Sequence, residues 1–294
     1  MSSWKGKSRG GFIGHLFFVL VLKYLSLSIA YFFLRFVALY FLFFTPKAFK
    51  AIYDLNYNRL GFGFFRSIAN VYTCFYTFGK ILVDKITMML ALRDDFQHDS
   101  IGMDNIRKIA EENRGGVLIT SHFGGWQSAA FFLDDSGIKP KLVMMEAEHE
   151  KIKQVFENRA KKFVLDVIPM TEDLSHIFAI AKALKNKEII SIQGDRILPG
   201  SKTIKVPFLG KEASFPVGPF AVIAKFNVPV SFIFSIKSGK THYKCIASPT
   251  IKLSDHPEIK KPRDKERFLI EQYALNLEKQ VLQHPEQWFN FYDF

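Results

Sequence analysis

From Gly115 onward, short apolar runs alternate with longer amphipathic stretches, and this alternation constrains the fold more than any other feature of the chain. Short apolar runs are typical of strands buried on both faces, whereas the amphipathic stretches between them are typical of helices. Strands that alternate with helices form a sheet with a parallel core that helices cover on both faces. We therefore expect an α/β fold with a mixed, mostly parallel central sheet flanked by helices.

The same pattern assigns the individual elements. It predicts buried strands at 116–123, 141–146, 165–170 and 188–195. It predicts helices at 126–135, 148–163, 173–186, 217–227 and from about 263 to 284. Asp173 is expected to cap the third of these helices. The runs 228–239 and 241–250 are predicted to pair as an antiparallel hairpin.

The first fifty residues combine a basic start with a long apolar run. Three basic residues precede the run 12–44, which only Lys23 and Arg35 interrupt. At about 1.5 Å per residue, one straight helix of this length exceeds the roughly 30 Å hydrocarbon core of a bilayer. Two arrangements remain open: a tilted helix whose charged side chains reach the headgroups, or a bent segment that lies partly in the interface. A buried core helix is disfavoured because the run lacks amphipathic periodicity.

The bent arrangement agrees better with the distribution of charge. Basic residues before the run favour a cytoplasmic amino terminus, and a single full span would then place the remaining chain outside the cytoplasm. A bent segment keeps both on one side. We expect an N-terminal membrane-embedded helical segment at 1–50, a helical membrane-proximal segment at 51–114 and an α/β catalytic domain at 115–294. The apolar stretch 49–90 is interpreted as further helices that touch the membrane.

Composition narrows the classes of partner. The net charge of +12 favours anionic partners, and the 32 phenylalanines suggest a lipid-facing surface. Nucleic acid is not expected, because no recognisable binding module is present and the aromatic residues lie in apolar runs. Two cysteines make a disulfide framework improbable. The histidines and cysteines lack ligand spacing, so no metal site is expected.

Two polar clusters, "SHFGG" (121–125) and "QGDR" (193–196), each lie at the carboxyl end of a predicted strand. Ligands bind at the carboxyl ends of parallel strands, so His122 and Asp195 are predicted to face one crevice. His122 is a candidate general base, since an imidazole titrates near neutral pH. The backbone N–H groups of Gly124 and Gly125 are candidate donors to an oxyanion or a phosphate. The alternative interpretation is structural: a satisfied histidine in a turn, and an Asp195–Arg196 pair that stabilises a loop.

Basic side chains and a proline-glycine turn complete the candidate site. The turn in "SFPVGPF" (214–220) would bring backbone close to a substrate, which makes Phe215 and Gly218 candidate substrate-binding residues. Basic residues nearby could hold the phosphates of coenzyme A, of a phosphopantetheine arm or of an acceptor headgroup. These candidates are Arg159, Arg196, Lys202 and Lys205.

Together these blocks resemble the lysophospholipid acyltransferase superfamily, and within it the bacterial lipid A late acyltransferases, which are lauroyl and myristoyl transferases. The resemblance lies in "SHFGGWQ", "GDR", "FPVGP", the apolar amino-terminal segment and the ending "HPEQWFNFYDF", and it spans nearly the whole chain. It implies a membrane-associated enzyme of the bacterial inner membrane whose α/β domain faces the cytoplasm. It further implies acyl transfer from acyl carrier protein or coenzyme A to a hydroxyl of a lipid or sugar. Because a thioester needs little further activation, no metal or redox cofactor is expected.

One position departs from the pattern that the resemblance implies. The family signature is a histidine, four residues, then Asp or Glu; His122 matches the histidine, but Gln127 holds the acidic position. Glutamine can accept a hydrogen bond from the ring but supplies no charge. Three explanations stand: Asp195 supplies the charge, the enzyme works with a weaker base on an activated thioester, or the protein is catalytically inactive.

The favoured function is therefore a membrane-bound O-acyltransferase in which His122 deprotonates an acceptor hydroxyl and Gln127 or Asp195 assists. Lipid A precursors, aminolipids and polyene-type lipids are all possible acceptors. The rival class is a non-catalytic lipid-binding or scaffold protein with the same fold. A third alternative is acyl transfer to nitrogen rather than oxygen.

Overall fold

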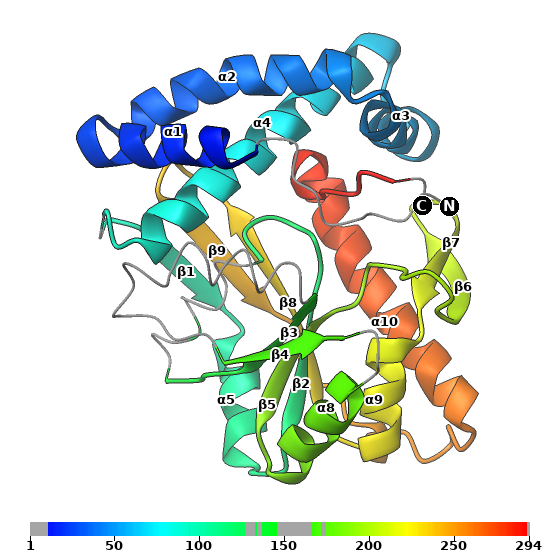
Figure 1. Ribbon diagram of the computed structural model, residues 1–294. Helices are drawn as coiled ribbons and strands as arrows, with labels where there is room; N and C mark the ends of the chain where they lie inside the picture. Colours follow the sequence, from blue (N-terminus) through cyan, green and yellow to red (C-terminus); the bar gives the residue numbers. More distant parts are fainter. Residues whose placement is uncertain are drawn as a thin grey trace.

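The computed structural model describes residues 11–93, 95–126, 133, 137–145, 166–171 and 175–292, which form a mixed α/β fold (Figure 1). Its central sheet has the strand order β1-β9-β8-β2-β5-β3-β4. All neighbouring strands of this sheet run parallel except β8 and β9, which are antiparallel. The expected mostly parallel sheet flanked by helices is thus confirmed, as is the hairpin that β8 and β9 form.

The bounds of the elements follow. The strands of the central sheet are β1 (Gln97–Ile101), β2 (Gly116–Thr120), β3 (Lys141–Met145), β4 (Val167–Met170), β5 (Ile189–Gln193), β8 (Val230–Lys237) and β9 (His242–Ala247). A separate hairpin consists of β6 (Thr203–Phe208) and β7 (Lys211–Pro216). The helices are α1 (Gly11–Tyr24), α2 (Leu27–Phe44), α3 (Pro46–Asp54), α4 (Phe64–Met89), α5 (Met103–Glu111), α8 (Ser175–Lys185), α9 (Gly218–Phe226) and α10 (Pro262–Gln283). Shorter helical turns lie at Leu55–Arg59, Leu253–Asp255 and Pro285–Gln287.

The apolar run of β2 explains why both faces of the sheet are covered. Successive strand residues point to opposite faces. Val117 and Ile119 belong to a core cluster with residues of α8, α9 and α10, whereas Leu118 packs with α5 on the other face. All five residues of β2 are buried. Full burial of such a side chain contributes about 1.5–3 kcal/mol, so this central strand fixes the two layers.

The long apolar run near the amino terminus is divided into two helices. The hydroxyl oxygen of Ser26 accepts a hydrogen bond from the backbone N–H of Ile29 and so caps α2 at its start, two residues after α1 ends. α2 then packs against α4 through a buried stripe: Leu27, Ala30, Tyr31, Leu34 and Ala38. The run is therefore interrupted between α1 and α2, and it has a core-facing side that its near-uniform hydrophobicity conceals. How the two helices lie in a membrane stays a prediction.

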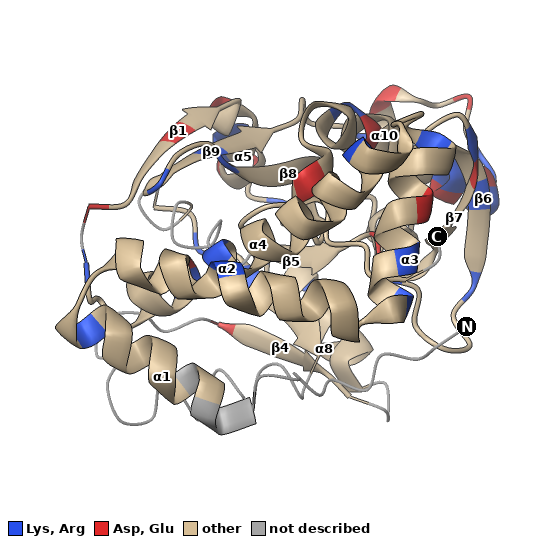
Figure 2. Ribbon diagram, turned by 90° about the horizontal axis from the view of Figure 1, so that it is seen from above, with Lys and Arg blue, Asp and Glu red and all other residues tan. Residues whose placement is uncertain are grey.

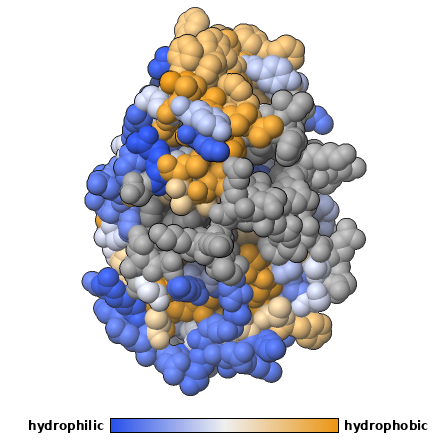
Figure 3. Space-filling view, turned by 60° about the vertical axis from the view of Figure 1, so that its left-hand side comes forward, coloured by the Kyte–Doolittle hydropathy of each residue, from blue (hydrophilic) through white to orange (hydrophobic). Residues whose placement is uncertain are grey.

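The outward side of α2 is apolar and aromatic. Phe32, Phe36 and Phe43 are 50%, 58% and 70% exposed. Lys23 and Arg35 are the only Lys, Arg, Asp or Glu residues of α1 and α2, so most of the ribbon of these helices is tan in Figure 2. Figure 3 shows apolar atoms gathered at the end of the molecule where these helices lie. Among the described residues α2 alone is long and apolar enough to cross a membrane, with a mean hydropathy of 2.0 and 28% of its residues buried.

The segment 51–114 differs in part from the expected row of membrane-touching helices. α4 contributes Val71, Cys74 and Phe75 to a core cluster that also contains Tyr243 and Cys245 of β9. Its inner face therefore packs against the sheet. The strand β1 also lies in this segment and pairs with β9, so the sheet extends upstream of residue 115.

Three sequence assignments lie outside the described residues, wholly or almost wholly. They are the helices 126–135 and 148–163 and the cap Asp173.

Candidate functional site

The register of two adjacent strands brings His122 and Asp195 together. Thr120 at the end of β2 lies beside Gln193 at the end of β5, and the N–H of Gly194 donates to the carbonyl of Thr120. His122 and Asp195 each lie two residues beyond this pair. The predicted juxtaposition of two residues 73 positions apart is therefore confirmed. Gly194 is required at this point, because a Cβ there would lie 2.7 Å from the Ile119 side chain.

Both oxygens of the Asp195 carboxylate bind His122. Nδ1 of the ring lies 2.9 Å from Oδ1, and the backbone N–H donates to Oδ2 over 2.8 Å. The Asp195 side chain is only 3% exposed and that of His122 15%. Burial raises the pKa of Asp195, but the attraction of His122, these hydrogen bonds and the charge of Arg196 outweigh it, so the pKa is lowered. The carboxyl group is ionised.

An ionised carboxylate fixes the tautomer of the neutral imidazole. Because a carboxylate only accepts hydrogen bonds, Nδ1 of His122 must carry the proton that it donates to Asp195. The lone pair of the neutral ring then lies on Nε2, which makes this nitrogen the candidate base. The ring is also flanked by Trp126, whose ring centroid lies 5.1 Å away. This is the arrangement that general-base catalysis requires.

The segment after α10 holds the His122 loop from the other side. Phe123 forms an antiparallel bridge with Trp288, and the N–H of Phe289 donates to the carbonyl of His122 over 2.9 Å. The hydroxyl of Tyr292 donates to the backbone carbonyl of Asp195 over 2.6 Å. Residues of the ending "HPEQWFNFYDF" thus act as an extra, short strand beside the site.

The expectation that Gly124 and Gly125 supply oxyanion donors is wrong for both N–H groups. The N–H of Gly124 donates to the carbonyl of Gln287 over 2.7 Å, and that of Gly125 to the carbonyl of Ser235 over 2.6 Å. The glycines serve close packing instead. Gly124 has φ +55°, and a Cβ there would lie 1.9 Å from the oxygen of Ser235.

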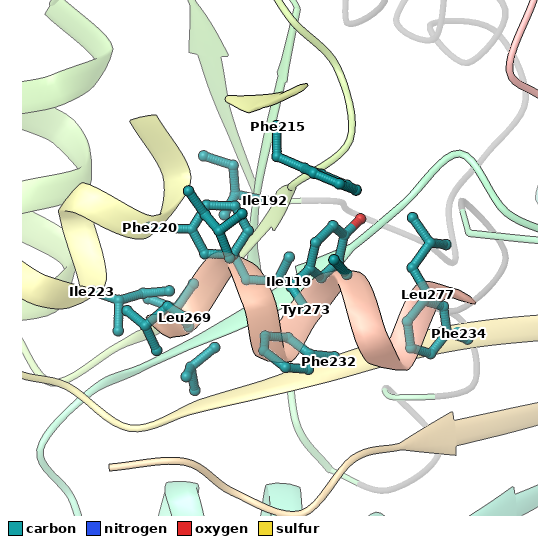
Figure 4. Close-up of a cluster of buried hydrophobic side chains, with 14 of the residues drawn as sticks. Ile119, Ile192, Phe215, Phe220, Ile223, Phe232, Phe234, Leu269, Tyr273 and Leu277 are labelled. Atoms are coloured by element: carbon teal, nitrogen blue, oxygen red, sulfur yellow. The ribbon is translucent and has the colours of Figure 1, made fainter. Parts of the chain in front are cut away.

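Phe215 lies in the hydrophobic core, which argues against the second expectation, that it binds substrate. Its side chain is fully buried, and its ring lies edge-on to that of Tyr273 at 5.9 Å (Figure 4). The turn in "FPVGP" therefore anchors β7 in the core. Gly218 is exposed at the start of α9, and a Cβ there would meet no atom within 4 Å, so its role in substrate binding stays a prediction.

The structure describes three of the four basic candidates, Arg196, Lys202 and Lys205. Arg196 donates to the carbonyl of Phe289 over 3.1 Å and its guanidinium lies over the ring of Tyr292, so it braces the carboxyl-terminal segment beside the site. Lys202 and Lys205 are exposed. Gln127 and Arg159 lie outside the described residues. Among the described residues, no group of three or more His, Cys, Asp or Glu side chains could hold a metal ion.

The low pKa of Asp195 makes stability depend on pH. Because the folded-state pKa lies below the ordinary value of about 3.9, the carboxylate stabilises the fold above that value and loses this contribution as pH falls through the folded-state pKa. We expect the free energy of unfolding to fall more steeply below about pH 4 in the wild type than in Asp195→Asn. Urea unfolding from pH 3 to 7 measures this, and parallel curves for the two proteins would contradict it.

The site residues lie within a stretch of the chain that matches a known protein family. The sequence model of the family described as bacterial lipid A biosynthesis acyltransferase matches residues 66–293. The match includes His122, Asp195 and the carboxyl-terminal segment, and it begins after α2. No curated protein matches the chain at a significant level.

Proposed function

Because this chain belongs to the bacterial lipid A biosynthesis acyltransferase family and is therefore an acyltransferase, we propose that it transfers a fatty acyl group from a thioester to a lipid hydroxyl. The observation that carries the proposal is the His122–Asp195 pair, with 2.9 Å between Nδ1 and the carboxylate. A histidine oriented by a buried carboxylate is suited to deprotonating an alcohol.

The proposed chemistry uses the two ring nitrogens of His122 differently. Nε2 takes the proton of the acceptor hydroxyl while its oxygen attacks the thioester carbonyl carbon, and a tetrahedral intermediate forms. When the carbon–sulfur bond breaks, the imidazolium returns the proton to the departing thiolate. Asp195 stabilises the imidazolium through Nδ1. This is the role that a carboxylate at position 127 would otherwise take, so Gln127 does not by itself argue for an inactive protein.

The donor is proposed to be acyl carrier protein or coenzyme A, both of which are anionic and suit a chain with a net charge of +12. Arg196 remains a candidate for a phosphate of the donor or acceptor, although it also binds the carbonyl of Phe289. Since the N–H groups of Gly124 and Gly125 are occupied, groups other than these amides must stabilise the oxyanion. No metal or redox cofactor is proposed, because a thioester is already activated.

The acceptor is proposed to reach the site from the cytoplasmic face of the bacterial inner membrane. The apolar helix α2 and the family are compatible with membrane association. The exposed aromatic side of α2, with Phe32, Phe36 and Phe43, supports contact between this helix and the apolar part of a membrane. A lipid A precursor, an aminolipid and a polyene-type lipid are the proposed acceptor classes.

Two measurements test this function. The purified full chain is incubated with radiolabelled lauroyl acyl carrier protein, or lauroyl coenzyme A, and an under-acylated lipid A precursor in micelles. Lipids of a strain lacking the gene are compared with the parent by mass spectrometry. We expect a labelled lipid product that mild alkali cleaves, and one acylated species missing from the deletion strain. An alkali-stable product would indicate an amide, and donor binding without turnover would favour the scaffold alternative.

A further inference from the structure

A cluster of buried polar groups connects α2 to the sheet. Asp84 of α4 is fully buried and accepts hydrogen bonds from the hydroxyl of Tyr31 on α2 and from the hydroxyl of Tyr243 on β9. Its second oxygen, Oδ2, lies 2.5 Å from Nζ of Lys237, the last residue of β8. That ammonium also donates to the carbonyl of Lys240. Four elements of the fold therefore meet at one carboxylate.

The backbone of Lys237 is in turn bound by the side chain of Gln287. The amide oxygen of Gln287 accepts from the N–H of Lys237 and its amide nitrogen donates to the Lys237 carbonyl, each over 2.9 Å. The backbone carbonyl of the same glutamine accepts from Gly124 of the His122 loop over 2.7 Å. A continuous chain of hydrogen bonds thus runs from Tyr31 to the residue two positions after His122.

A second connection runs through the ring of Tyr243. A Cβ at Gly125 would lie 2.7 Å from Cε1 of this ring, so the ring packs directly against the loop. Tyr243 is fully buried, and its hydroxyl bonds Asp84 over 2.5 Å. The loop is therefore linked to Asp84 through Tyr243 and to Lys237 through Gln287. These residues bind the loop at Gly124 and Gly125, so they would act on the base through its position.

We propose that Tyr31, Asp84, Lys237, Tyr243 and Gln287 form a positioning brace that holds the His122 loop, so that α2 contributes to catalysis and does not serve the membrane alone. This inference rests on the proposed function, because it assigns the brace to the reaction at His122. A misplacement of about 1 Å can lower a rate about a hundredfold, so loosening the brace is expected to affect kcat. Substrate affinity should change little.

The test uses Tyr31→Phe, Gln287→Met and the double variant. Acyl transfer from radiolabelled lauroyl acyl carrier protein to an under-acylated lipid A precursor gives kcat and both KM values, and urea unfolding gives the fraction folded. We expect kcat to fall several-fold in Tyr31→Phe and about ten- to a hundredfold in Gln287→Met, with both KM values within about twofold. The double variant should lose less than the product of the two single losses, since both changes loosen the same brace.

Tyr72→Phe is the matched control. Its hydroxyl also links the same two helices, donating from α4 to the carbonyl of Arg35 on α2 over 3.4 Å, but it does not reach Lys237. It should retain the wild-type kcat. The brace is refuted if Tyr31→Phe behaves like Tyr72→Phe, or if the losses in the double variant multiply. If Gln287→Met does not fold, the comparison of the two tyrosines decides.

His122→Ala separates the two proposals. An inactive His122→Ala with a fully active Tyr31→Phe would overturn the brace alone, whereas an active His122→Ala would overturn the proposed function.

Discussion

Replacement of Asp195 by asparagine is expected to lower kcat for acyl transfer by about 10⁴-fold, the effect that the same change has in serine-hydrolase triads. The amide nitrogen of asparagine would donate to Nδ1 of His122, where the carboxylate now accepts over 2.9 Å. The ring proton would then move to Nε2 and remove the base. The imidazolium would also lose its compensating charge. KM should change little, because neither effect involves substrate binding.

Two further proteins test this prediction: His122→Ala and the double variant His122→Ala/Asp195→Asn. Residues that act as one unit give non-additive losses, so all three proteins should show similar residual rates. Circular dichroism and urea unfolding check that each protein is folded. A kcat within tenfold of the wild type in Asp195→Asn would show that Asp195 only stabilises the loop. The negative charge that stabilises the imidazolium would then have to come from another group, or His122 would act as a weaker base without such a charge.

Replacement of Lys237 by methionine is expected to lower the free energy of unfolding by about 3–5 kcal/mol, the usual cost of removing one partner of a buried ion pair. The Lys237 side chain is 5% exposed and Asp84 is fully buried, so the carboxylate would lose its cation in a place that water does not reach. Burial raises the pKa of Asp84 and lowers that of Lys237, while the attraction between them opposes both shifts. Urea unfolding at pH 7 measures the loss.

The double variant Asp84→Asn/Lys237→Met separates the stranded charge from the lost contact. With both charges removed, we expect much of the stability to return, because the desolvation cost disappears with them. The exposed pair Arg107–Asp104 serves as control: breaking it should cost at most about 1 kcal/mol. A loss below 1 kcal/mol in Lys237→Met would show that the buried carboxylate takes up a proton at little cost.

The sheet and its two central site residues could be predicted because their signals are local. Parallel strands buried on both faces need continuous apolar runs, and the run of β2 has one. His122 and Asp195 lie at equal distances beyond two such runs, so pairing of the strands in register was enough to bring them together. The β6–β7 hairpin was missed although a signal existed: Ile204, Val206 and Phe208 are buried at alternate positions.

The remaining contacts depend on tertiary packing, and local patterns do not encode it. β1, "QHDSI", is polar and mostly exposed, and it is a strand because β9 pairs with it. Gly124 and Gly125 suggested a helix start open to a ligand, but their N–H groups meet carbonyls from distant segments. Asp84 was not singled out from the sequence, although an acid in the apolar stretch "ILVDK" was a usable signal, since buried charges are paired. The sequence does not say that the partner of Asp84 is Lys237.

The pairing of Phe123 with Trp288 has a consequence for how the molecule matures. Segments more than a hundred positions apart must meet before the loop is fixed, and contacts of such long range form slowly. A polypeptide cut after α10 would retain β2 and its apolar neighbours while leaving the histidine without its backbone partner. Because Trp288 and Phe289 also belong to two core clusters, proteolysis in that short stretch is expected to weaken the core as well as to release the histidine loop.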